Sequence, residues 1–279
     1  MSPVTSPADP FPPHDPAGGP SDSVIVQYYT HEYDEETRLA RSPAGRLEHV
    51  RTQEIVRRAL PSSPVRIADV GGGTGTHAKW LVADGHDVVL VDLTPSHVDA
   101  ARRAFPALSA LVGDARALPL DDDSVDAVLL LGPLYHLTAV DDRLQALREA
   151  VRVCRPGGQV IAAAISRYAA LLDLAAQGRL TSDVLAKVRG QMATGVHDHS
   201  VGFTEAYFHL PDELAGELRG AGLTDVTLHG VEGPLWIAFH GAEADADIEH
   251  ALAVARELET DPAAMGMGSH LLAVGTVAG

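Results

Sequence analysis

Hydrophobic residues along this chain follow two alternating spacings. Short runs rich in valine, leucine, isoleucine and alanine predict strands at 65–70, 87–92, 109–112, 125–131, 159–165, 224–231, 235–240 and 270–277. Between them, apolar residues three or four positions apart predict helices at 76–83, 95–104, 141–153, 211–220 and 245–258. This alternation is typical of strand-helix-strand units, so we predict an α/β fold built on a parallel sheet.

Three segments lie outside this alternation. Residues 1–23 hold seven of the 18 prolines and predict a disordered tail, because such a segment cannot bury enough apolar surface to offset its ordering entropy. The helical pattern of 24–60 predicts two helices ahead of the core, with a break at Pro43 and Gly45. Residues 166–209 combine helical patterns with a loop rich in glycine and histidine, and we interpret them as an inserted helical lid. The folded domain is therefore expected to span 24–279.

Charge and cysteine usage narrow the range of partners. The chain carries 21 Lys and Arg against 38 Asp and Glu, a net charge of −17, which disfavours binding to nucleic acid or to an anionic membrane surface. With Cys154 as its one cysteine, the chain cannot form an intrachain disulfide, and this fits a reducing, cytoplasmic setting. No apolar run approaches the roughly 18 residues of a spanning helix, so we expect a soluble protein, monomeric or homodimeric.

The most informative stretch is a glycine-rich turn between a predicted strand and a predicted helix. Asp69 is followed by Gly71, Gly73 and Gly75, and glycines at such a turn let a ligand approach the main chain beside a helix N-terminus. A dinucleotide fingerprint would have a further glycine where Thr76 stands, and the Asp69 carboxylate would repel a pyrophosphate. Both observations argue against the main enzymatic alternative, an NAD(P)-dependent oxidoreductase.

A second acid, Asp92, indicates which groups the ligand contains. Asp92 ends the next predicted strand, 17 residues after Gly75, where a carboxylate can accept both hydroxyls of a ribose. The sequence therefore predicts a ligand that has a ribose and no phosphate.

Several motifs in order resemble those of class I S-adenosylmethionine-dependent methyltransferases, from residue 65 to 165. The matching segments are Asp69 to Gly75, Asp92, Gly113-Asp114-Ala115, the stretch 118–126 and Arg155-Pro156-Gly157-Gly158. The resemblance implies a Rossmann-like, seven-stranded, mostly parallel sheet with an antiparallel last strand, and S-adenosylmethionine as cofactor.

The same resemblance assigns cofactor-binding roles. Asp69 and the glycines would hold the methionine part, Asp92 the ribose and Asp114 the adenine amino group, with Leu93 and Ala115 also in contact with the cofactor. Leu131, at the end of the fourth predicted strand, is included in the expected pocket. Tyr28 would close over the methionine end, as a tyrosine before the core does in similar methyltransferases, and Arg51 would pair the methionine carboxylate, with Arg46 or a surface role as the alternatives.

Methyl transfer is an in-line displacement, so the protein must align a small organic acceptor and exclude water. An oxygen, nitrogen or carbon acceptor that has to lose a proton also needs a base, and histidine has a suitable pKa. His136 and the adjacent Tyr135, after the fourth predicted strand, are our candidate catalytic residues. His136 is the candidate base, with helix capping or packing against the cofactor as the alternative.

Two alternatives remain open. His197, His199 and His209 have a spacing compatible with metal binding, but we expect them to contact the acceptor and expect no metal in this protein. A protein that binds S-adenosylmethionine without using it in catalysis would share the same cofactor motifs.

Overall fold

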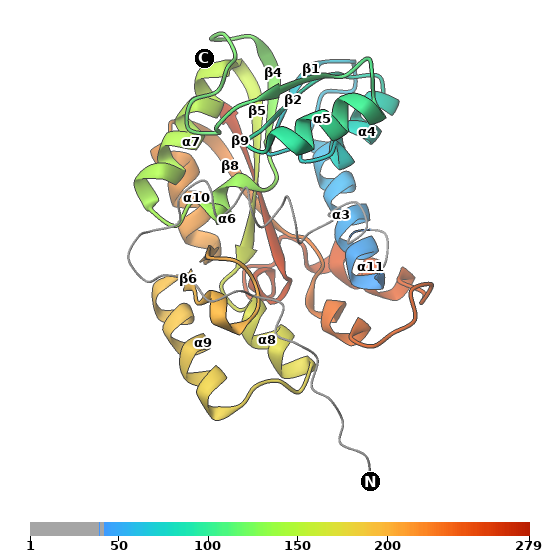
Figure 1. Cartoon of the computed structure of the whole chain (residues 1–279), viewed down its shortest axis with the longest axis vertical. Coiled ribbons are helices and arrows are strands. Elements are labelled where there is room, and N and C mark those ends of the chain that lie inside the picture. Colours follow the sequence, from blue (N-terminus) through green and yellow to red (C-terminus); the bar gives the residue numbers. More distant parts are fainter. Residues whose placement is uncertain (1–38, 40–41) are drawn as a thin grey trace.

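The computed structural model describes Leu39 and residues 42–279, and it has a central sheet covered by helices on both faces (Figure 1). The strands of the first half are β1 Arg66–Val70, β2 Asp87–Asp92, β3 Ser109–Val112, β4 Val125–Leu130 and β5 Cys154–Ser166. The helices among and before them are α3 Pro43–Ala59, α4 Thr76–Ala83, α5 Pro95–Ala104, α6 Pro133–His136 and α7 Val140–Val153. The predicted tail 1–23 and Tyr28 lie outside the described residues.

The second half of the chain adds the lid and the end of the sheet. Its helices are α8 Ala169–Ala176, α9 Ser182–Thr194, α10 Pro211–Gly220 and α11 Glu249–Leu258, with the 3-10 turns η1 His199–Val201, η2 Pro234–Phe239 and η3 Met265–Met267. Its strands are β6 Val196–His197, β7 Ala206–His209, β8 Leu223–Gly230 and β9 His270–Val277. Within the described part of the chain, no helix is both long and apolar enough to cross a membrane.

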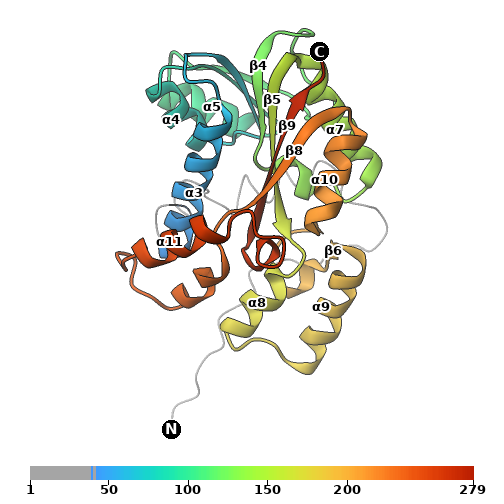
Figure 2. The ribbon, with the colours of Figure 1, turned by 180° about the vertical axis from the view of Figure 1, so that it is seen from behind.

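Seven strands form the main sheet, in the order β3-β2-β1-β4-β5-β9-β8. The first five are mutually parallel, whereas β9 is antiparallel to both β5 and β8, between which it runs (Figure 2). The short strands β7 and β6 extend the carboxyl end of β5 and raise the total to nine. The predicted α/β class, with its mostly parallel sheet and antiparallel last strand, is confirmed.

Alternate residues of the central strands enter two apolar layers. In β4, Val128 and Leu130 pack toward α7 and α10, while Ala127 and Leu129 pack toward α3, α4 and α5. Because both faces are covered, this strand has no polar alternation except at its start, as expected for a central parallel strand.

One predicted strand is wrong. Residues 235–240 belong mostly to the 3-10 turn η2. Gly233, with a φ of 64°, turns the chain away from β8, and Pro234 cannot donate to a strand ladder. Trp236 instead packs against Leu47 and α11, and its indole N–H donates to the Met267 carbonyl at 3.0 Å.

Two predicted boundaries also move. β5 starts at Cys154, five residues earlier than expected, and includes the predicted turn; the register with β4 shifts there, and Gly157 has a φ of 80°. α11 starts at Glu249, four residues later than expected, where the Asp247 carboxylate accepts from the Glu249 N–H.

The predicted break at Pro43 and Gly45 is the beginning of α3. Pro43 takes the first helical position, where no N–H is needed, and the Ser42 side chain caps the helix by accepting from the Gly45 N–H at 3.0 Å. One N-terminal helix is thus described, and most of the segment predicted to hold the other lies outside the described residues.

The region predicted as a helical lid contains α8 and α9 and, in addition, the small hairpin of β6 and β7. Both ribbon views place α8 and α9 beyond the carboxyl edge of the sheet (Figures 1 and 2). β7 joins that edge through the parallel pairs Ile165–Phe208 and Ser166–His209. An apolar cluster fills the lid and includes Tyr135, Val188, Val201 and Phe208.

Candidate active site

A pocket opens at the carboxyl ends of β1, β2, β3 and β4. It is lined by Val70, Gly71, Gly73, Asp92, Leu93, Thr94, His97, Gly113, Asp114, Ala115, Arg116, Gly132, Pro133, Tyr135, His136 and Leu137. Eight of the predicted site residues meet here, because successive parallel strands end at one edge. Gly75, Leu131, Asp69 and Arg51 are not part of this lining.

The glycine turn after β1 is held in backbone conformations that favour glycine. Gly71, Gly73 and Gly75 have φ values of 72°, 57° and 99°. A Cβ on Gly71 would lie 2.7 Å from the Pro133 ring, and a Cβ on Gly72 would lie 2.8 Å from the Asp69 carboxylate. The turn therefore packs tightly between its neighbours, and Asp69 lies buried beneath it.

Asp92 connects the turn to the end of β2. Its two carboxylate oxygens accept from the Gly73 N–H at 2.9 Å and from the Thr94 N–H at 2.8 Å, and His97 Nδ1 lies 3.4 Å away. A carboxylate has further lone pairs, so this arrangement positions Asp92 and still lets it accept from hydroxyls in the pocket.

Asp114 is paired within its own loop. Arg116 binds its carboxylate with its guanidinium, at distances down to 2.6 Å, and with its backbone N–H at 2.8 Å. Burial would raise the pKa of Asp114, but these hydrogen bonds outweigh burial and lower it. The loop therefore presents an ionised carboxylate and an arginine, and Arg116 is a pocket residue that our sequence analysis missed.

His136 joins the pocket to the lid. Its ring lies 4.7 Å from that of Tyr135 and 5.9 Å from that of Phe203, centroid to centroid, and Phe203 in turn lies 6.5 Å from His197. Burial lowers the pKa of His136 to about 4, against the opposing charge of Asp92. The imidazole is consequently neutral at physiological pH.

His197 is the lid histidine that shares this aromatic cluster. It is 4% exposed and stacks on Phe208 with a centroid distance of 4.9 Å. Burial lowers its pKa to about 4 as well. Phe203, the residue that connects it to His136, carried no sequence signal, because an isolated aromatic in a loop has no periodicity to mark it.

The other two predicted lid histidines lie elsewhere. His209 is buried with its Nε2 3.3 Å from Glu217, which also binds Arg143, whereas His199 is exposed in η1. Among the described residues, the candidate metal-ligand group consists of Glu48, Glu232 and His270 and includes none of the three.

The prediction for Arg51 is corrected. Its guanidinium is completely buried and binds Glu54 and Glu259, and its Nε donates to the Val231 carbonyl at 3.3 Å. These contacts tie α3 to the loop after β8 and to the residue following α11. Arg51 therefore has a structural role and does not line the cofactor pocket.

Cys154 is a core residue. It is fully buried, and burial raises the pKa of its thiol to about 12, which leaves it without nucleophilic reactivity at neutral pH.

Comparison with known proteins finds methyltransferases. Residues 68–162 match the model of a methyltransferase domain. An uncharacterised methyltransferase of Mycobacterium tuberculosis is 45% identical over 101 residues, which make up 36% of this chain and 40% of that protein. A demethylmenaquinone methyltransferase of Paenarthrobacter aurescens is 30% identical over 196 residues, 68% of this chain and 74% of that protein.

The fold also matches solved structures. A methyltransferase from Thermotoga maritima that depends on S-adenosylmethionine superposes with a TM-score of 0.59 at 21% identity, covering 91% of this chain and 99% of the other. Together with the glycine turn, the ordered acids and the shared sheet, the sequence relationships place this chain in the class I S-adenosylmethionine-dependent methyltransferase family.

Proposed function

We propose that this protein transfers a methyl group from S-adenosylmethionine to a small, flat organic acceptor of the phenol or hydroquinone type. The observation that carries this proposal is the position of His136, which lines the cofactor pocket and also contacts Phe203 of the lid. One side chain thus borders both the pocket proposed for the cofactor and the lid, and an acceptor would have to lie close to it.

The pocket residues fit the cofactor. Gly71 and Gly73 line the pocket without side chains, Asp92 can accept ribose hydroxyls, and Leu93 and Ala115 provide apolar walls for an adenine. When bound, S-adenosylmethionine supplies a methyl group on a positively charged sulfur. Tyr135 lines this pocket, and its aromatic ring would be available to that charge.

The lid supports an apolar, aromatic acceptor. Phe203 and Phe208 join Tyr135 and Val201 in one cluster, and the histidines next to them are neutral by burial. Such a surface favours a flat ring over a charged molecule. The relationship to the Paenarthrobacter demethylmenaquinone methyltransferase supports an acceptor of this chemical class.

His136 is the proposed proton acceptor. It is neutral, so it can take a proton from an acceptor hydroxyl as the new bond forms. A pKa of about 4 makes it a weak base, and most of the rate enhancement would then come from alignment and from excluding water.

The test is an assay of transfer with a panel of acceptors: a reduced naphthoquinol, simple phenols, a primary amine and a keto acid. We expect a mass increase of one methyl group on the naphthoquinol or the phenols, and a smaller yield from the Asp92→Ala variant when S-adenosylmethionine is limiting. Methylation of the amine alone would contradict the acceptor class. Tight binding of S-adenosylmethionine without transfer to any compound would support the alternative of a non-catalytic cofactor-binding protein.

A further inference from the structure

A second cavity, of about 350 Å³, lies between the start of α3, α8 and η2. It shares no lining residue with the cofactor pocket. Three carboxylates border it, from Glu48, Asp173 and Glu232, together with the imidazoles of His240 and His270. The described residues that line it include no lysine or arginine, so the cavity wall has the charge of a cation-binding site.

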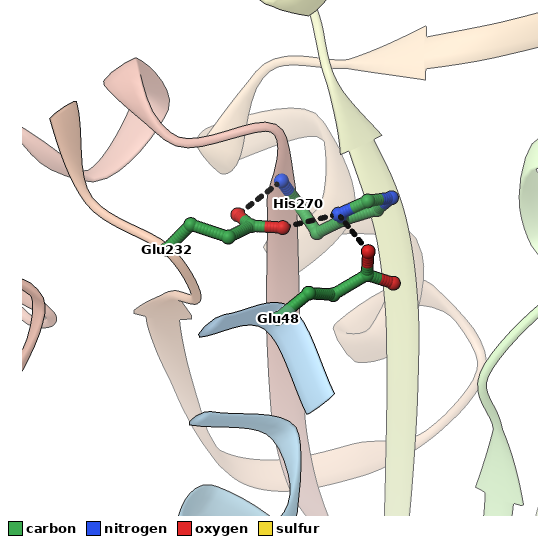
Figure 3. A group of neighbouring side chains, drawn as sticks. All are labelled: Glu48, Glu232 and His270. Carbon is green, nitrogen blue, oxygen red and sulfur yellow. Dashed lines mark hydrogen bonds and ion pairs between the residues drawn. The ribbon is translucent and has the colours of Figure 1, made fainter. Parts of the chain in front are cut away.

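Three of these side chains converge on one point (Figure 3). Glu232 Oε1 lies 2.5 Å and Glu48 Oε2 lies 3.9 Å from Nδ1 of His270. The second oxygen of Glu232 accepts from the backbone N–H of His270 at 2.9 Å, which fixes the orientation of that carboxylate. The potential ligand atoms of the three residues all lie within 4.8 Å of one another.

The sheet itself brings these residues together. Glu232 follows the end of β8 and His270 begins β9, and the antiparallel pairing of Gly230 with Leu271 makes the two neighbours. Glu48, on the first part of α3, covers them from the other side. Two of the three ligands thus lie on a helix and a strand, and the third, Glu232, is 2% exposed.

We propose that Glu48, Glu232 and His270 form a binding site for a divalent metal ion of the Zn²⁺ or Mn²⁺ type, open toward the cavity. One imidazole nitrogen and two carboxylate oxygens are a ligand set that such ions accept. An ion about 2.1 Å from each ligand atom requires separations of about 3 to 4 Å between them. The 3.9 Å separation lies within that range, the 2.5 Å separation lies below it, and no separation exceeds 4.8 Å, so side-chain movements of about 1 Å suffice.

Three protein ligands would leave coordination positions for other molecules, and all three ligand residues line the cavity. The competing structural explanation is an ion pair between His270 and the two glutamates with no metal. The two explanations differ in the bound metal content, which is measured without reference to methyl transfer. The proposed metal site can therefore be tested without assuming the proposed methyl transfer.

The experiment uses the full-length chain, without an affinity tag, treated with a chelator and titrated with ZnCl₂ and with MnCl₂. Calorimetry and elemental analysis after desalting should give about one ion per chain, and binding should raise the melting temperature. Glu48→Gln and His270→Gln should each weaken binding by at least about 10-fold, because each removes a ligand.

Asp173→Asn is the matched control, because it removes a carboxylate from the same cavity wall that instead pairs with His240 at 3.1 Å. It should leave the affinity within about threefold of wild type, well below the effect of losing a ligand. Glu48 is partly exposed, so Glu48→Gln keeps the test valid if a change at the buried Glu232 prevents folding. No bound ion, or equal loss of binding in Asp173→Asn and Glu48→Gln, would overturn the proposal.

Discussion

The cofactor edge, formed by the loops after β1 to β4, and the cap, formed by α3, η2 and α11, are built in different ways. At the cofactor edge, Asp92 ends its strand, and Gly71 and Asp114 follow theirs within two residues. In the cap, Arg51 meets Glu259 across more than 200 positions of sequence, and Glu48 meets His270 in the same way.

The comparison separates polar side chains that are available to bind a ligand from polar side chains that stabilise the fold. Polar groups at the cofactor edge line a pocket, whereas the guanidinium of Arg51 in the cap is completely buried among protein partners. The two regions should consequently respond differently to substitution: Arg51 of the cap through stability, and the cofactor-edge residues through binding or turnover.

The largest expected effect is on the stability of the cap. Arg51→Met should lower the free energy of unfolding by about 3 kcal/mol, because it removes at once the buried partner of Glu54 and Glu259 and the donor to the Val231 carbonyl. Chemical denaturation measures this change. Arg57→Met, which breaks an exposed pair with Asp84, should cost less than about 1 kcal/mol. A selective loss of cofactor affinity in Arg51→Met, with unchanged stability, would instead support the predicted pairing of Arg51 with the methionine carboxylate.

The next effect concerns turnover at the boundary between pocket and lid. His136→Gln should lower kcat by about 100-fold and leave the dissociation constant of S-adenosylhomocysteine within about threefold. Steady-state kinetics and calorimetry separate the two quantities. The exposed His250→Gln serves as control. Weaker cofactor binding with an unchanged kcat would instead make His136 a wall of the cofactor pocket.

The dependence of kcat on pH is a further test of the role of His136. Because burial lowers the pKa of His136 to about 4, its imidazole stays neutral from pH 8 down to about 5. We expect no fall in kcat from this group over that range, in contrast to the fall near pH 6 to 7 that a histidine of ordinary pKa would give.

A smaller effect is expected for binding at the cofactor edge. Asp92→Ala should cost about 2 kcal/mol of affinity for S-adenosylhomocysteine, because it removes acceptors for the ribose and releases the Gly73 N–H. The same titration with S-adenosylhomocysteine is carried out on Asp121→Ala, a change at an exposed position, as the control. Equal losses in the two variants would refute the ribose assignment.

The smallest expected effect is on the pH dependence of stability, through His197 of the lid. The unfolded chain binds a proton on His197 below pH 6.5, whereas the folded chain does so only near pH 4, so stability falls as the pH decreases between these values. Between pH 6.5 and 5 this contribution is about 1.5 kcal/mol. His197→Phe should remove it, which melting curves at both pH values would detect. An unchanged pH dependence would show that His197 is not buried as a neutral ring.

Much of the fold followed from local pattern. The helices at Thr76–Ala83, Pro95–Ala104 and Pro211–Gly220 and the strand His270–Val277 have the predicted boundaries, because apolar spacing, prolines and glycines mark them within a few residues. Residues 235–240 misled the prediction because an apolar run fits a strand and a 3-10 turn equally, and only packing against α3 and α11 decides between them.

The sequence alone determined the family, the sheet and the order of the cofactor residues, since those residues lie where consecutive parallel strands end. Tertiary structure decided which distant side chains meet: Arg51 with Glu259, His136 with Phe203, and Glu48 with Glu232 and His270. Such contacts have no spacing along the chain that could mark them. They arise when α3, the lid and the antiparallel end of the sheet pack together, and the burial that results is also what lowers the pKa of His136.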